Sequence, residues 1–173
     1  MTQFRITKKY ADYIKVKQLS MPNDVTPIFD DWFIDMVRIR RRKVAMVTHA
    51  KTLLTFILPY KDIGGAKAVP ECLKVLLLEY LYENDFNDLA EIVENQFLND
   101  GIVYCKTVNR RILGHMNDFK VCLDCHGYYH NDQFESIDWE KVVEQINETP
   151  LGSVKYKNPR MLAKELFSGT YIN

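Results

Sequence analysis

The segment from Asn109 to Phe119 reads Asn-Arg-Arg-Ile-Leu-Gly-His-Met-Asn-Asp-Phe and groups several side chains that could do chemistry. A histidine near its ordinary pKa can shuttle protons at neutral pH, and an arginine can stabilise charge on a reacting phosphate. One hypothesis is therefore a metal-independent, toxin-like ribonuclease with His115 as general base and Arg110 or Arg111 as charge stabiliser. Five helical residues turn through about 500°, so Arg110 and His115 diverge by about 140° and only Arg111 lies near the histidine. The alternative is a helix cap at Asn109 followed by solvated polar groups.

A second stretch, from Arg38 to Lys43, holds five cations within six residues. Guanidinium groups match phosphate oxygens in geometry, and Arg110 and Arg111 add two cations near a predicted helix start, where free amides also favour anions. We predict a surface for nucleic acid or for an acidic protein, if the two basic stretches meet in space. The alternative is a solvated hairpin end whose arginines pair with acids. The predicted binding residues are Arg40, Arg41, Arg42, Lys43, Arg110 and Arg111, with Asn117 and Asp118 orienting the site.

A third stretch contains Cys122, Cys125, His126 and His130. Its motif, Cys-x-x-Cys-His, matches the motif for covalent haem attachment. We reject a haem site because no export signal precedes the motif. On one helix these side chains approach a common face and could hold zinc, giving a zinc-stabilised interaction domain. One helix rarely closes a tetrahedral site, so partly buried cysteines are the favoured interpretation. The sequence also has no phosphate-binding glycine loop, dinucleotide fingerprint or nucleophile elbow, and no cofactor is predicted.

A sheet and several helices must position these stretches. Runs rich in β-branched and aromatic residues predict strands, and apolar residues at helical spacing predict helices. The expected strands are 3–6, 32–39, 43–48, 53–58 and 102–107, of which the middle three form an antiparallel meander. The expected helices are 8–16, 70–81, one capped by Asp85, 110–129, one beginning at Asp138 and one beginning at Asn158-Pro159. We predict a single α+β domain over residues 1–173, an antiparallel sheet packed by helices mainly from the C-terminal half.

The composition is that of an ordinary globular protein. Of the 173 residues, 47% are hydrophobic and 27% are charged, so one domain can bury a sizeable core. Lysine plus arginine equals aspartate plus glutamate at 23 each, which argues against a broadly basic coat but allows a local patch. The N-terminus has no signal-peptide pattern, the apolar runs are too short for a bilayer, and the four cysteines are expected to stay reduced. We therefore expect a cytoplasmic protein without membrane contact.

Residues 109–119 also resemble the signature of an uncharacterised bacterial domain-of-unknown-function family, which reads Asn-x-x-x-Leu-Gly-Ser-Met-Asn-Asp-Phe. His115 stands where that signature has serine, so chemistry that needed the hydroxyl would be lost here. Other parts of the chain are similar to further parts of the family, namely Thr7-Lys8-Lys9, Asp31-Trp32 through Lys43, and a tail with Asn147, Pro150, Lys155-Tyr156 and Pro159. The resemblance implies a domain-sized fold and no established activity.

The leading hypothesis is thus a non-enzymatic bacterial module that binds nucleic acid or an acidic protein surface through arginine-rich residues. The ribonuclease and the zinc-stabilised domain are the alternatives. The leading hypothesis depends on whether side chains of 38–43 and 109–118 meet in space.

Overall fold

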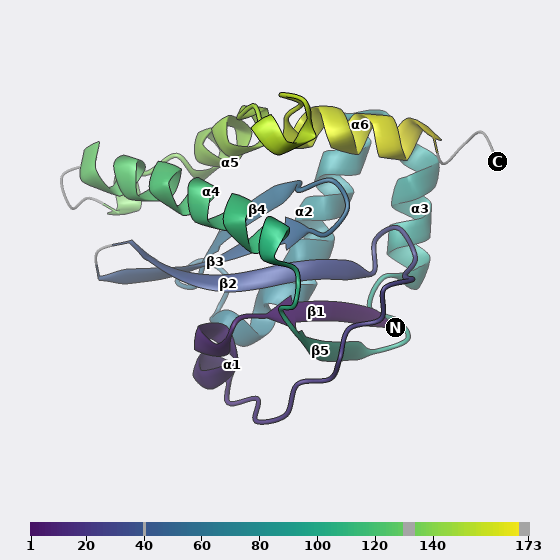
Figure 1. Ribbon diagram of the computed structural model, residues 1–173, viewed down its shortest axis with the longest axis horizontal. Coiled ribbons are helices and arrows are strands. Elements are labelled where there is room, and N and C mark those ends of the chain that lie inside the picture. The colour runs from purple at the N-terminus through teal and green to yellow at the C-terminus, as the bar shows by residue number, and fades with distance from the viewer. Residues whose placement is uncertain (40, 130–133, 170–173) are drawn as a thin grey trace.

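The computed structural model describes residues 1–39, 41–129 and 134–169, with 126–129 described by their backbone alone (Figure 1). Five strands form one sheet in the order β4-β3-β2-β1-β5. The strands are β1 (Thr2–Ile6), β2 (Asp31–Ile39), β3 (Arg42–His49), β4 (Thr55–Pro59) and β5 (Ile102–Lys106). The predicted strands and the antiparallel meander of β2, β3 and β4 are confirmed.

The sheet is mixed, which corrects the prediction of a purely antiparallel sheet. Strand β1 pairs in parallel with β2 on one side and with β5 on the other. Parallel neighbours need a long crossover, and the connection from β1 to β2 contains α1 (Lys8–Ile14) and a further loop. Strand β5 is reached only after two more helices, so it too can enter beside β1 in the same direction. The parallel direction of these strand pairs therefore follows from the length of the connections and not from the composition of the strands.

Helices cover both faces of the sheet (Figure 1). One apolar core lies between the sheet and α1, α2 (Val69–Glu83), α3 (Asn87–Gln96) and α6 (Pro159–Gly169). The other lies between the opposite face and α4 (Arg110–Tyr129) and α5 (Trp139–Glu148). In β2, Trp32 and Ile34 enter the first core, whereas Phe33 and Val37 enter the second. A strand whose two faces are both covered is mostly apolar, and β2 fits this apart from Asp31, Asp35 and Arg38.

Side-chain caps set where several helices begin. The Asn109 side chain accepts from the backbone N–H groups of Arg111 (3.1 Å) and Ile112 (3.2 Å), as predicted. Asp138 caps α5 by accepting from Lys141 N–H at 3.1 Å. The predicted cap at Asp85 is wrong, because Asp85 has a left-handed backbone (φ 61°) and α3 starts two residues later. Of the helices in the described part of the chain, none has the length and apolar character needed to cross a bilayer.

Candidate functional site: a cleft at the sheet edge

The two basic stretches lie at opposite ends of α4. Arg110 and Arg111 begin this helix, and its 20 residues extend over about 30 Å toward the β2–β3 turn (Figure 1). Arg42, at that turn, pairs with Glu135 of the short 3-10 helix η2 (Phe134–Ser136), which follows α4 in the chain. The condition for a joint basic site is therefore not met. Arg40 lies outside the described residues.

Two cations of the turn, Arg42 and Lys43, already have partners. Arg42 and Lys61 donate to the same oxygen of Glu135, at 3.0 Å and 3.2 Å. A hydrogen bond from its own backbone, then one from Lys61, and then the charges of Lys61 and Arg42 hold the pKa of Glu135 below its usual range. The Lys43 ammonium lies 4.1 Å from the ring centroid of Tyr13 in α1. Arg41 is exposed and forms no ion pair with the described residues.

His115 is only 8% exposed and packs on the side of α4 that faces the 3-10 helix η3 (Gly152–Val154). Its Nε2 shares a 2.8 Å hydrogen bond with the Ser153 hydroxyl, and its Nδ1 is buried without a partner among the described residues. Burial lowers the pKa of His115 and keeps the ring neutral, and the charge of Asp118 opposes this shift. Arg110 and Arg111 are both exposed. A general base needs an accessible nitrogen, and neither nitrogen here is open to a substrate.

Asn117 is held in a separate set of contacts. Asn117 accepts a hydrogen bond from Lys120 at 2.9 Å, and Lys120 in turn pairs with the buried carboxylate of Asp35 in β2 at 2.5 Å. On the same sheet face, Arg5 makes a two-point contact with Asp31 at 2.8 Å and 2.7 Å. These buried ion pairs, which the sequence analysis did not identify, fasten α4 and β1 to β2. Their hydrogen-bonding capacity is used inside the fold.

The cysteine stretch gives no metal arrangement in the described residues. Cys122 is half-buried beside the α4–α5 core, and burial raises the pKa of its thiol, whereas Cys125 is exposed. The side chain of His126 and the whole of His130 lie outside the described residues. Among the side chains that are described, no three of His, Cys, Asp or Glu gather as metal ligands would.

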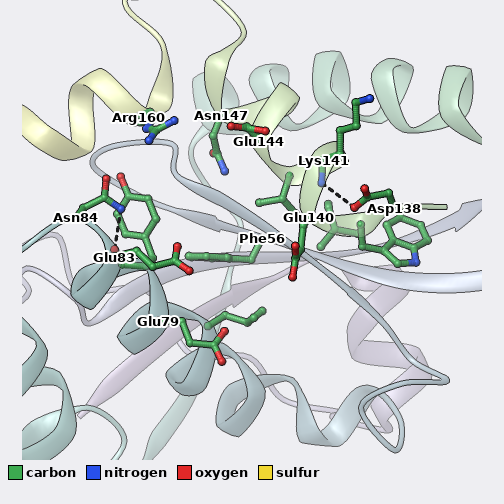
Figure 2. A pocket seen from close by; sticks show the side chains of 15 residues that line it. Phe56, Glu79, Glu83, Asn84, Asp138, Glu140, Lys141, Glu144, Asn147 and Arg160 are labelled. Carbon is green, nitrogen blue, oxygen red and sulfur yellow. Dashed lines mark hydrogen bonds between the residues drawn. The ribbon is translucent and has the colours of Figure 1, made fainter.

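A cleft of about 620 Å³ opens between α2 and α5, at the free edge of β4 (Figure 2). This volume lies in the range of sites for small ligands or for a short peptide segment. Its apolar lining comes from both cores at once, because β4 is the last strand and its two faces meet there. The apolar lining residues are Phe56, Ile57, Leu76, Trp139 and Val143, with the ring of Tyr80.

Along this cleft, only some of the outward-facing backbone groups of β4 have hydrogen-bond partners. The Asn147 amide of α5 accepts from Thr55 N–H and donates to Thr55 C=O, both at 2.8 Å. These groups point away from β3, and alternate residues of an antiparallel strand point the same way, so the N–H and C=O of Ile57 also face outward. Among the described residues they have no hydrogen-bond partner. Pro59, the next outward residue, has no N–H to offer.

Carboxylates surround this edge. Glu79 and Glu83 come from α2 and Glu140 and Glu144 from α5, and Figure 2 shows Glu79, Glu83 and Glu140 directed into the space between the helices. None of the four forms an ion pair or hydrogen bond with the described residues. Lys141 points away from the cleft. The lining therefore carries uncompensated negative charge.

The other polar side chains that line the cleft either have partners already or are buried. Arg160 is paired with Glu148 of α5 at 3.1 Å, and Asp138 is used as the α5 cap. The Tyr80 hydroxyl is buried without a partner among the described residues, and burial raises its pKa. The sequence analysis missed the cleft. Its only linear signal is two Glu-x-x-x-Glu pairs on predicted helices, and nothing local says that these helices face each other.

Comparison with known proteins gives a family and nothing beyond it. The sequence model of a family described as Domain of unknown function (DUF6933) matches residues 3–162. The matched region contains every residue that lines the cleft. No curated protein and no solved structure matches the chain. Function is therefore argued from the site alone.

Proposed function

The chain belongs to the DUF6933 family of domains of unknown function, and we propose that it is a non-enzymatic binding module whose ligand occupies the cleft between α2 and α5. One observation carries the proposal. Four glutamates without ion partners line an apolar cleft, and there the backbone N–H and C=O of Ile57, a residue only 4% exposed, have no hydrogen-bond partner among the described residues. Like charges gathered on one surface repel each other, and buried backbone groups without partners cost free energy. A ligand that pairs with the carboxylates and with the Ile57 backbone would explain why they occur together.

The charge of the cleft selects the ligand. Four carboxylates on one concave surface attract cations, and apolar walls lower the local dielectric and strengthen that attraction. The apolar lining favours a ligand that also has hydrocarbon, as lysine and arginine side chains do. We therefore assign a basic polypeptide segment as the ligand.

Binding accounts for the lining better than catalysis does. The described residues that line the cleft include no histidine, cysteine or serine, so the lining offers no Ser–His or Cys–His pair. The histidine in the ribonuclease hypothesis, His115, is enclosed elsewhere by α4 and η3. The carboxylates can attract charge without any proton transfer.

Calorimetric titration with acetyl-tetralysine-amide tests the proposal, with acetyl-tetraglutamine-amide as the neutral control. The lysine peptide is expected to bind more weakly as salt rises, because salt screens exposed charges. A variant with Glu79, Glu83, Glu140 and Glu144 all changed to Gln is expected to bind the lysine peptide about tenfold more weakly. Equal affinity for the original chain and this variant would contradict the proposal.

A second candidate function is nucleic-acid contact at the β2–β3 turn, through Arg40, Arg41, Arg42 and Lys43. The observation that supports it is a partly exposed aromatic ring next to these cations. Beneath the Lys43 ammonium, Tyr13 is stacked on Tyr60 with ring centroids 5.5 Å apart, and Tyr13 is 44% exposed. Cations beside an exposed ring can hold single-stranded nucleic acid. A salt-sensitive gel shift with single-stranded RNA that Arg41→Gln weakens would support this function, and no shift at low salt would exclude it.

A further inference from the structure

We infer that the segment bound in the cleft is an extended strand that adds to the edge of β4 and carries basic side chains at adjacent positions. This inference rests on the proposed function and specifies the ligand of the same site. It follows from three features of the cleft: the unpaired backbone groups of Ile57, the Asn147 contact beside them, and the distribution of carboxylates over two helices.

The Asn147 contact shows that the edge of β4 accepts an amide. A side-chain amide presents one carbonyl and one N–H, as a peptide bond does, and it bonds both outward groups of Thr55 at 2.8 Å. Two residues further along, Ile57 offers the same pair with nothing on it in the described structure. An added strand would continue at Ile57 the pairing that Asn147 makes at Thr55. Asn147 at one end and Pro59 at the other confine the added strand to this point.

The two helices flank opposite faces of the added strand. Helix α2 packs in the core that receives Phe56, and α5 packs in the core that receives Ile57. A strand placed beside β4 would therefore direct successive side chains alternately toward α2 and toward α5. Both helices present glutamates, so both sets of side chains would meet carboxylates. Basic residues at neighbouring positions suit this arrangement, whereas residues spaced by two would all face one helix.

Two other occupants are separable by experiment. A polyamine would satisfy the carboxylates but would not use the Ile57 backbone. A second copy of this chain could offer the basic β2–β3 turn, since the chain carries as many basic as acidic residues. That occupant would make the protein associate with itself as its concentration rises.

Paired peptides of identical composition test the inference. Acetyl-Thr-Val-Lys-Arg-Val-Thr-amide has adjacent cations, and acetyl-Thr-Lys-Val-Arg-Val-Thr-amide has cations spaced by two. We expect calorimetry to show tighter binding of the first. In a series of the first peptide with one backbone nitrogen methylated at a time, the methyl group that removes the bond to Ile57 C=O is expected to weaken binding about fivefold, and its two neighbours are expected to have little effect.

The outcomes separate this inference from the proposed function. Equal affinity for the two peptides and no effect of methylation would overturn strand addition. The proposed function would still stand if the four Glu→Gln changes weakened binding about tenfold. Binding that ignores those changes would overturn both. Sedimentation tests whether the ligand is a second copy of this chain. Self-association that is lost in the Glu→Gln variant and also in an Arg41→Gln, Arg42→Gln, Lys43→Gln variant would show that a second copy, and not a partner strand, occupies the cleft.

Discussion

The cleft beside β4 and the turn between β2 and β3 both gather charged residues, and they use charge differently. At the turn, Arg42 is paired with Glu135 and Lys43 lies over an aromatic ring. In the cleft, four glutamates face an apolar wall and have no partner among the described residues. A dense run of charge in a sequence therefore does not identify available charge. The density at the turn comes from five cations in one segment, whereas the cleft assembles two pairs of acids that are 61 residues apart in the chain, at 79 and 140.

The two regions also differ in how their contacts contribute to stability. The Arg42–Glu135 pair is about half exposed on both sides, so water and salt weaken it. The Asn147–Thr55 contact is buried and satisfies a strand edge that would otherwise lack partners. Stability should therefore depend on the contact next to the cleft and hardly at all on the contact at the turn.

The largest expected effect comes from Asn147→Ala. The variant loses two buried hydrogen bonds and leaves Thr55 N–H and C=O without partners, so the free energy of unfolding should fall by about 3 kcal/mol. Arg42→Ala, the matched change at the turn, should cost no more than about 0.5 kcal/mol. Urea unfolding of both variants measures the difference. Similar losses in the two variants would remove the contrast between the regions.

A smaller effect is expected from neutralising the charges of each region in turn. Changing Glu79, Glu83, Glu140 and Glu144 to Gln should weaken the binding of the adjacent-cation peptide about tenfold, because each exposed pair contributes a few tenths of a kcal/mol. Changing Arg41, Arg42 and Lys43 to Gln should leave this affinity unchanged. Calorimetry on both variants at one salt concentration measures the two affinities. If the turn variant lost the binding and the cleft variant kept it, the roles of the regions would be reversed.

The smallest expected effect concerns Glu135. The pKa of this carboxyl is depressed, so its favourable pairing with Lys61 and Arg42 is present above the ordinary carboxyl range and is lost as pH falls through the lowered pKa. Glu135→Gln mimics the low-pH state at neutral pH and frees both cations. If the turn contacts RNA, this change should raise RNA affinity by about twofold to threefold in a gel shift, as expected for one surface charge. Lower affinity would argue against the turn as an anion surface.

Local patterns predicted much of the fold correctly. The meander, the long helix from Arg110 and the cap at Asn109 follow from periodicity and capping chemistry, which involve residues close in sequence. The parallel pairing of β1 was not predictable in this way, because it depends on how a long connection crosses the sheet. Similarly, the Ser153–His115 bond joins residues that are 38 apart in the chain.

The candidate site was predicted less well for the same reason. The basic residues of the turn were visible because they are consecutive, but their partners, Glu135 and Tyr13, come from distant segments. The cleft depends on β4 being the edge strand and on two helices covering opposite faces. The strand order of the sheet creates this site, and no single segment of the sequence encodes it.

Amide hydrogen exchange within β4 tests the central claim most directly, because one strand holds both the probe and its control. The Thr55 amide is bonded to Asn147, whereas the Ile57 amide faces the cleft without a partner among the described residues. In the free chain, NMR should show Thr55 strongly protected and Ile57 exchanging much faster, and the adjacent-cation peptide should slow Ile57 specifically. Equal protection of the two amides in the free chain would mean that the edge of β4 is already covered, and would contradict the proposal that a ligand binds there.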